Sequence, residues 1–450
     1  MWCWLRCAPV WRYAWRSFTY LQEVSLSTRF LIRGGYVFFP EEEALRRADV
    51  EIAEGRIKRI AETLPAEANT RIIEAQDKLL SPGLIDLHAH LREPGREDTE
   101  TLESGAWAAL AGGFTTICAM PNTQPPMDTR EQAAFISKRS DELGLARILP
   151  VGAATKGRAG EEIAEYALLK EAGAVAVTDD GDWIYSAEVM RCALEYAGML
   201  GLVVITHAEE PSLCEEGIMN ESAVSAKLGL KVRPAVAEEA AIQRDIALAF
   251  CTGSHLHVAH ITTTRGVELV RQARVKGIKV TAEATPHHLL LTDEALLSFD
   301  ANYKVYPPLR TEEDRKALLE ALKDGTIQAI ATDHAPHAIE EKEQELDLAP
   351  AGMIGLQTAL SVLWEGLVEP EVIKPELLLR LLTTGPASVI GESVELNVGS
   401  PANLVVFDPA ARWTFDAETN RSLSWNSPWF GKKLKGKVEH VFLGERHFSF

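Results

Sequence analysis

The spacing of apolar residues divides the chain into two kinds of sequence. From residue 29 to about 83, and again near the C-terminus, short apolar runs are separated by glycine turns, as in ADVEIAEGRIKRIA, and this spacing predicts β-strands. Between these regions, strand-like runs alternate with helical stretches, as in AVAVTDD, AEVMRCALEYAGMLG and LVVITHAEE. Repeated β–α–β units of this length predict a parallel sheet with crossover helices.

The repeated units suit a (β/α)8 barrel, because they extend over about 300 residues. We therefore expect a TIM-like barrel at residues 84–385. Neither flanking β segment has enough strands to bury a sheet face alone, so residues 27–83 and 386–450 are expected to form one small β-sandwich domain. Residues 1–26 hold four of the ten tryptophans. We expect them to be a non-native or disordered N-terminal extension.

Composition narrows the class of function. Asp plus Glu number 65 and Lys plus Arg number 46, which gives a net charge of −19. This charge repels phosphate backbones and anionic membranes, so we expect neither as a partner. The six cysteines form no C-x-x-C pair, and no apolar run reaches the roughly 18 residues of a membrane helix. We expect a soluble cytoplasmic protein with free thiols that acts on a small molecule.

Ten of the twelve histidines lie between residues 88 and 337, mostly just after an apolar run. The C-terminal ends of barrel strands meet at one mouth, so polar residues there indicate function. The segment DLHAHLREPG places His88 and His90 on one face of a strand, where both can reach one metal. An H-x-H pair alone is equally compatible with two surface histidines.

Four other apolar runs also end in polar residues. VAVTDDG ends in two acids, which alone indicate a turn or cap but beside metal ligands can bridge two ions. LVVITH ends in His207 and HLHVAH in His260, and either alone is typical of a core histidine. In IQAIATDHAPH, Asp333 is placed where a carboxylate can contact a metal and move a proton. Together these groups predict one or two divalent metals, with zinc the first choice.

A metal that activates water and polarises a carbonyl implies hydrolysis. Arg92 has a planar fork that suits a substrate carboxylate, and an ion pair with Glu93 or Glu97 is the alternative. Asn122 offers a donor and an acceptor together, as amide recognition requires, and a plain turn residue is the alternative.

These motifs resemble those of the class I dihydroorotases, a branch of the cyclic amidohydrolases. The similarity runs from about residue 29 to the C-terminus and includes SPGLIDLHAHLREPG, AGGFTTICAMPNTQPPMDT, VTAEATPHHLLLT, IATDHAPH and NSPWFGKKLKG. LREPG and MPNT are more similar to dihydroorotase than to allantoinase or hydantoinase. The resemblance implies reversible hydrolysis of dihydroorotate to N-carbamoyl-L-aspartate in pyrimidine biosynthesis, with one or two zinc ions per subunit.

The resemblance also implies a role for each site residue. The implied metal ligands are His88, His90, Asp180, His207, His260 and Asp333. One zinc would lie on the first histidine pair and the second zinc on the other pair, with Asp180 as the bridge. Asp333 would be the catalytic acid and base. The implied substrate-binding residues are Arg92, Asn122, His337, Tyr306, Ala351 and Gly352. Many relatives bridge their metals with a carboxylated lysine, whereas TDDG here indicates an aspartate. The motif alignment selects Asp180 over Asp179, which spacing alone does not.

Two departures from the family bear on the substrate. Tyr306 stands where the family usually has a substrate-contacting Asn, which its hydroxyl is a candidate to replace, and Ala351 stands where an aromatic residue commonly precedes the glycine. The alternatives are therefore an allantoinase, a dihydropyrimidinase or another cyclic amidohydrolase, although Arg92 favours a substrate with a carboxylate. A third is a non-catalytic scaffold for aspartate transcarbamoylase, but scaffolds lose metal ligands that this chain keeps. We expect a homo-oligomer, and an active enzyme is also able to bind that transcarbamoylase.

Overall fold

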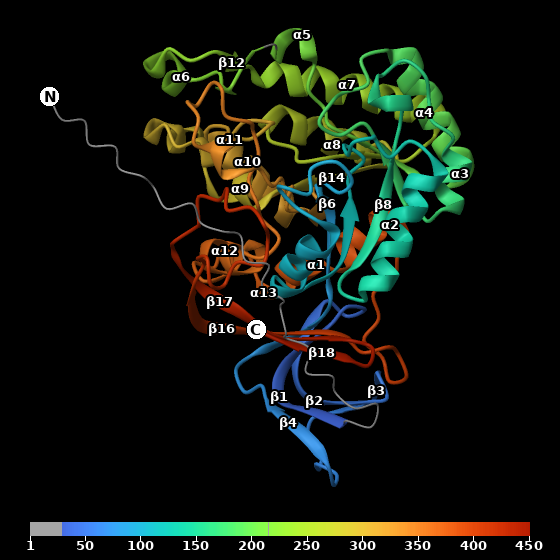
Figure 1. The fold of residues 1–450 in the computed structure, drawn as a ribbon, viewed down its shortest axis with the longest axis vertical. Coiled ribbons are helices and arrows are strands. Elements are labelled where there is room, and N and C mark those ends of the chain that lie inside the picture. The colour runs from blue at the N-terminus through green and yellow to red at the C-terminus, as the bar shows by residue number, and fades with distance from the viewer. Residues whose placement is uncertain (1–28, 215) are drawn as a thin grey trace, which may run out of the picture.

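The computed structural model describes residues 29–214 and 216–450 and contains the expected barrel (Figure 1). Eight strands pair side by side, each parallel to its neighbour. They are β6 (Leu84–Ala89), β7 (Phe114–Ala119), β8 (Arg147–Ala153), β9 (Ala176–Thr178), β10 (Val203–Thr206), β13 (Leu256–Val258), β14 (Val280–Ala284) and β15 (Ala329–Ile330). The first and last strands meet just beyond β15, where the His90 N–H donates to the His334 carbonyl over 2.8 Å. The predicted (β/α)8 class is confirmed.

Helices cover the outside of the barrel (Figure 1). The longer ones are α1 (Leu102–Ala111), α2 (Arg130–Leu143), α4 (Ala187–Leu200), α7 (Ala235–Thr252), α8 (Thr264–Val275), α10 (Glu312–Lys323), α13 (Pro375–Leu382) and α14 (Thr384–Ile390). Local sequence sets their ends. Helix α4, for example, begins after Ser186, whose hydroxyl accepts the Val189 N–H, and ends at Gly201, whose φ of 68° suits a residue without Cβ.

Shorter elements complete the connections between the strands. They are α3 (Tyr166–Glu171), α5 (Pro211–Cys214), α6 (Ala223–Leu228), α9 (Pro286–Leu290), α11 (Ile339–Lys342), α12 (Ala359–Leu363), the 3-10 turns Lys156–Arg158, Asp293–Ser298 and Ala301–Tyr303, and a π-helical turn at Trp364–Val368. A small parallel pair, β11 (Met219–Asn220) with β12 (Val232–Arg233), lies outside the barrel sheet.

The two ends of the chain share a second sheet, seen below the barrel in Figure 1 with blue and red strands together. Its strands are β1 (Arg29–Phe39), β2 (Ala44–Ala53), β3 (Arg56–Ala61), β4 (Thr70–Glu74), β5 (Leu79–Pro82), β16 (Asn403–Thr414), β17 (Lys433–Leu443) and β18 (Arg446–Ser449). Antiparallel pairing of β16 with β5 joins the N- and C-terminal segments, as predicted. The exact domain limits stay a prediction, and helix α14 extends across the boundary expected after residue 385. The expected extension at 1–26 lies outside the described residues.

Strand β16 shows how this sheet attaches to the barrel. Leu404 and Val406 pack with the core of the small sheet, whereas Val405 and Phe407 pack with the barrel core. Alternate side chains of a strand point to opposite faces, so one strand serves both cores. The small sheet is therefore buried against the barrel through one of its faces.

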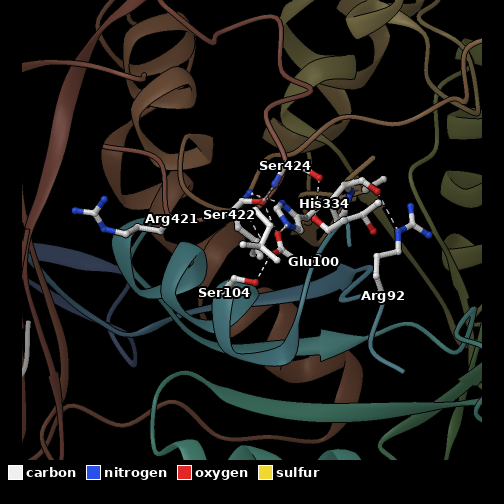
Figure 2. A network of polar contacts seen from close by, with 12 residues as sticks. Arg92, Glu100, Ser104, His334, Arg421, Ser422 and Ser424 are labelled. Carbon is white, nitrogen blue, oxygen red and sulfur yellow. Dashed lines mark hydrogen bonds and ion pairs between the residues drawn. The ribbon is translucent and has the colours of Figure 1, made fainter. Parts of the chain in front are cut away.

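The segment 420–427, between β16 and β17, lies on the barrel mouth (Figure 2). Buried Glu100 accepts hydrogen bonds from the hydroxyl groups of Ser104 and Ser422 and, over 3.2 Å, from the Leu423 N–H. The His334 Nε2 atom lies 3.1 Å from the same carboxylate. The C-terminal part of the chain is thus bound to the loops that follow β6 and β15.

Two further observations concern the described part of the chain. None of its helices is long and apolar enough to cross a membrane. Its four cysteines, Cys118, Cys192, Cys214 and Cys251, are free thiols.

Candidate active site

The six candidate metal ligands come together at the barrel mouth, although the sequence separates them by up to 245 residues. Each lies at or just beyond the C-terminal end of a different strand, except that His88 and His90 share β6. All six side chains are buried. The barrel therefore brings the polar ends of five apolar runs into one cluster, as its geometry requires.

Asp180 lies between the two histidine pairs. Its Oδ2 atom is 3.1 Å from His88 Nε2 and 3.5 Å from His90 Nε2. Its Oδ1 atom is 3.6 Å from His207 Nδ1 and 3.4 Å from His260 Nε2. One carboxylate oxygen thus faces each pair, which is the arrangement of a bridging ligand.

Asp179, the neighbouring acid, is engaged elsewhere. Its carboxylate accepts the Thr155 N–H over 2.9 Å and the Thr155 hydroxyl. It therefore holds the loop after β8 and does not face the histidines. Geometry distinguishes the two acids where spacing along the chain does not.

Asp333 lies beside the first histidine pair, His88 and His90. Its Oδ1 atom is 3.1 Å from His90 Nε2 and 3.6 Å from His88 Nε2. Two groups of potential ligand atoms lie close enough to share an ion, namely His88 with His90 and Asp333, and His88 with Asp180 and His260. Both groups have the nitrogen and oxygen donors that zinc binds.

Hydrogen-bond accounting tests whether these residues fit a metal. His88 Nδ1 is 3.1 Å from Glu283 Oε1, His90 Nδ1 is 2.8 Å from Asn122 Oδ1, and His207 Nε2 is 3.2 Å from Glu209 Oε2. Oxygens of carboxylates and amides only accept, so each outer ring nitrogen donates and each inner one keeps a lone pair when the ring is neutral. The inner atoms His88 Nε2 and Asp180 Oδ1 are buried without any hydrogen-bond partner. Lone pairs that face carboxylates with no proton between them fit a divalent cation.

The ionisable groups of the cluster strongly shift one another's pKa values. Burial alone would raise the pKa of Asp180, but His88, His207 and His260 outweigh burial and hold it well below its usual range. Burial would likewise lower the pKa of His207, but Asp180 and Glu209 raise it to about 9. The cluster therefore keeps its carboxylates ionised despite their burial.

Three candidate residues have backbone conformations that non-glycine residues seldom adopt. The φ angles are 62° at Arg92, 32° at His260 and 47° at Asp333. Each such conformation costs about 1–3 kcal/mol and persists only where the surrounding structure imposes it. Backbone strain of this kind is common at functional sites, and here it occurs at three of the predicted site residues.

Arg92 lies beside the cluster without a carboxylate partner among the described residues. Its Nε atom donates to the Pro336 carbonyl over 3.2 Å (Figure 2). Glu93 instead accepts the Leu102 N–H, and Glu97 accepts the Gly95 N–H. The ion pair considered as an alternative is therefore not formed. Burial lowers the pKa of Arg92 to about 10, which leaves the guanidinium charged at neutral pH.

His337, Ala351 and Gly352 form one group near Arg92. The His337 Nε2 atom donates to the Ala351 carbonyl over 2.8 Å, and burial, with Arg92 nearby, lowers the pKa of His337 to about 2. Gly352 has a φ of +129°, and a Cβ there would lie 2.8 Å from Ala335 Cβ and 2.9 Å from His337 Nε2. Ala351 thus contributes its carbonyl, and only glycine fits beside it.

The Tyr306 hydroxyl is engaged by the backbone of another loop. The hydroxyl donates its single proton to the Gly217 carbonyl over 3.0 Å, so it can only accept from a further partner. The Arg233 guanidinium lies 3.6 Å above the Tyr306 ring and donates to Glu209 Oε2 over 2.7 Å. Tyr306 is therefore linked through Arg233 and Glu209 to His207.

Sequence reasoning missed the acceptors behind the histidines. Glu209 follows His207 by two residues in ITHAEE, and Glu283 is an acid inside the apolar strand VTAEA. An acid in a buried strand is the signal that could have identified Glu283. Arg233 carried no such signal, because its role depends on contact with Tyr306, far away in the sequence.

A cavity of about 420 Å3 opens beside His207. Its lining residues are Gly181, Asp182, Trp183, His207, Glu209, Pro211, Ser212, Cys214 and Arg233. The cavity is large enough for a small ring compound, and both polar and apolar groups border it.

Known proteins were compared with the chain. A family model described as "Dihydro-orotase-like" matches residues 77–266. A dihydroorotase from Caldanaerobacter subterraneus subsp. tengcongensis is 44% identical over 417 residues, which cover 92% of this chain and 96% of the relative. The chain belongs to the dihydroorotase family. A dihydroorotase from Pelotomaculum thermopropionicum is 46% identical over 93% of this chain and 98% of its own length.

Solved structures of the wider cyclic amidohydrolase group share the fold of this dihydroorotase family member. An L-hydantoinase from Arthrobacter aurescens has a TM-score of 0.81 at 24% identity, covering 93% of this chain and 95% of that one. A D-hydantoinase has a TM-score of 0.78 at 26% identity, with the same coverage. The chain is accordingly a cyclic amidohydrolase, a class of enzymes that is typically metal-dependent.

Proposed function

We propose that this chain is a zinc-dependent dihydroorotase, which interconverts (S)-dihydroorotate and N-carbamoyl-L-aspartate in pyrimidine biosynthesis. The observation that carries the proposal is the position of Asp180, with one oxygen toward each histidine pair. Membership of the dihydroorotase family supports the choice of substrate. His88 and His90 would hold one zinc, and His207 and His260 a second, with Asp180 between them.

Zinc at this site would activate water and polarise the ring carbonyl. The protein's part in the reaction falls to Asp333, whose Oδ1 atom lies 3.1 Å from His90 Nε2. Asp333 accepts a proton as water adds to the ring carbonyl, and it returns a proton to the ring nitrogen as the C–N bond breaks. The Nε2 atoms of His90 and His88 both lie within 3.6 Å of that Oδ1 atom.

Substrate binding is assigned to the groups around Arg92. The guanidinium has no carboxylate partner of its own among the described residues and is suited to the carboxylate of dihydroorotate. The Asn122 oxygen is engaged with His90, so its amide NH2 group is left to donate to the ring. His337 is neutral and lies beside Ala351 and Gly352. Tyr306 lies against Arg233.

We also propose a cytoplasmic location and a homo-oligomer, and a complex with aspartate transcarbamoylase is compatible with this activity. Four free cysteines among the described residues support a reducing compartment.

The proposal is tested by hydrolysis of dihydroorotate beside dihydrouracil, hydantoin and allantoin. Dihydroorotate should be turned over fastest, and Arg92→Lys should raise its KM at least tenfold, because lysine lacks the planar fork. The matched control is Arg96→Lys at a more exposed arginine that pairs with Asp98. Faster turnover of any ring without a carboxylate would contradict the proposed substrate.

A further inference from the structure

A line of polar side chains runs through the barrel from the candidate metal site toward the opposite end. Glu283 on β14 lies below His88, and His257 on β13 lies on the other side of Glu283. Both are buried, with exposed fractions of 1% and 0%. The barrel core also contains apolar side chains such as Leu87, Val151 and Ile205. A buried carboxylate in such a core is unfavourable unless donors surround it.

The contacts of this line can be followed atom by atom. Glu283 Oε1 is 3.1 Å from His88 Nδ1, and Glu283 Oε2 is 3.1 Å from His257 Nε2. His257 Nδ1 is 2.8 Å from the Thr281 hydroxyl, which is 2.9 Å from His255 Nε2. His255 is only partly buried, at the end of the barrel away from the metal ligands. Five side chains thus form one continuous series of hydrogen bonds.

Donor and acceptor capacity sets the direction of every bond. An ionised carboxylate only accepts, so both imidazoles donate to Glu283. A neutral His257 then has no proton on Nδ1, and this atom accepts the single proton of the Thr281 hydroxyl. The Thr281 oxygen in turn accepts from His255 Nε2–H. No alternative arrangement satisfies all these groups while His257 is neutral.

We propose that Glu283 is a positioning residue for the metal site, held in place from below by His257 and Thr281. A histidine that binds a metal is neutral, and a proton fixed on His88 Nδ1 leaves the Nε2 lone pair directed at Asp180 and Asp333. This inference rests on the ligand set of the proposed function. It adds that metal affinity depends on residues deep in the barrel that touch neither metal nor substrate.

Glu283→Gln gives the first test, because glutamine has the same shape but only one accepting oxygen. Its amide NH2 group must face either His88 Nδ1–H or His257 Nε2–H, and one imidazole must change its tautomer. Loss of such an outer partner typically weakens metal binding about 10–100-fold. We expect a weakening in that range for zinc.

Thr281 gives a matched pair of variants that leaves Glu283 and every candidate ligand intact. Thr281→Val removes the hydroxyl but keeps the shape, so His257 loses its donor and Glu283 its fixed support. Thr281→Ser keeps the hydroxyl. We expect Thr281→Val to weaken zinc binding severalfold and Thr281→Ser to bind zinc as the wild type does.

The experiment measures the zinc dissociation constant of metal-free protein by competition with a chromophoric chelator, together with the visible spectrum of the Co2+-loaded protein. Weaker zinc binding and an altered Co2+ spectrum in Glu283→Gln and Thr281→Val, with neither in Thr281→Ser, support the inference. Zinc binding unchanged in Glu283→Gln, or equal in the two Thr281 variants, overturns it. If Glu283→Gln does not fold, the Thr281 pair decides.

The same measurements separate this inference from the proposed function. A wild-type protein that binds no zinc overturns the metal site and this role together. A wild-type protein that binds zinc but does not hydrolyse dihydroorotate overturns only the proposed substrate, and the zinc affinities of the variants still decide the role of Glu283.

Discussion

At the scale of single residues, hydrogen bonds behind the histidine rings fix which ring nitrogen faces the candidate metal site. Three of the four candidate ligand histidines have an acceptor behind the ring, namely Glu283, Asn122 or Glu209. These acceptors turn the lone pairs inward, toward Asp180 and Asp333. The site is thus arranged by groups that the histidine pattern of the sequence did not reveal.

Asp333→Asn tests the proposed division of labour at this scale. The variant removes the group that moves the proton but only one of six candidate ligands. We expect zinc content close to that of the wild type and a kcat lower by about 10²–10⁴-fold. Elemental analysis and steady-state kinetics on the same sample measure both, and full activity would remove Asp333 from the mechanism.

Tyr306 is one of the two positions at which this chain is expected to depart from the family pattern. Its hydroxyl is bound to Gly217 and its ring to Arg233. Tyr306→Phe keeps the ring, so we expect the KM for dihydroorotate to change less than about threefold. Tyr306→Leu releases Arg233 and should lower kcat/KM more than the Phe variant does. An equal loss in both variants would mean that the hydroxyl contacts the substrate.

At the scale of elements, two buried lysines hold the loop that carries Ala351 and Gly352. The Lys304 Nζ atom donates to the carbonyls of Leu346 and Ala349, over 2.8 Å and 2.7 Å. Lys342 Nζ donates to the carbonyls of Pro350 and Gly352, over 2.9 Å and 3.0 Å. Backbone carbonyls therefore replace the carboxylate partners that buried lysines usually have.

Lys342 gives this loop a dependence on pH. Burial lowers the pKa of Lys342 from 10.5 to about 7. Between these values the unfolded chain binds the proton that the folded protein releases, so stability rises with pH. We expect the free energy of unfolding of the wild type to gain on that of Lys342→Met from pH 7.5 to 9.5, by at most about 1.4 kcal/mol per pH unit. Urea unfolding measures this gain, and a constant difference between the two proteins would contradict it.

The segment 420–427 is likewise held by hydrogen bonds to one buried side chain, that of Glu100 (Figure 2). Three donors of Ser104, Ser422 and Leu423 converge on this carboxylate, with His334 as a fourth contact. Glu100→Gln places an NH2 group among donors and should lower the free energy of unfolding by about 2 kcal/mol. Glu103→Gln, at an exposed site on α1, should change it by less than about 0.5 kcal/mol. Equal unfolding midpoints for the two variants would show that Glu100 does not secure the segment.

At the scale of the whole molecule, the sequence predicts the barrel well because its signal is local. The alternation of strands and helices, and the polar residues that end VAVTDD, LVVITH and IATDHAPH, follow from periodicity alone. The union of the two end segments was also predictable, since neither could bury its strands by itself, and the pairing of β5 with β16 shows it.

What the sequence did not predict depends on contacts between distant segments. Glu283 meets His88 across 195 residues, and Arg233 meets Tyr306 only once the loops at the mouth have folded. Spacing alone likewise does not separate Asp180 from Asp179, although the motif alignment selects Asp180, and the contacts of Asp179 with Thr155 give the physical reason. Spacing along the chain carries no information on such contacts, because the barrel sets them.

The central claim is that the histidine and aspartate cluster is a metal site for hydrolysis of dihydroorotate. The most direct test is to remove metal with a chelator and then titrate zinc into the protein while dihydroorotate hydrolysis is followed. We predict no turnover without metal and a rise that saturates at one or two zinc ions per chain. Full turnover by the metal-free protein, or bound zinc without turnover, would contradict the claim.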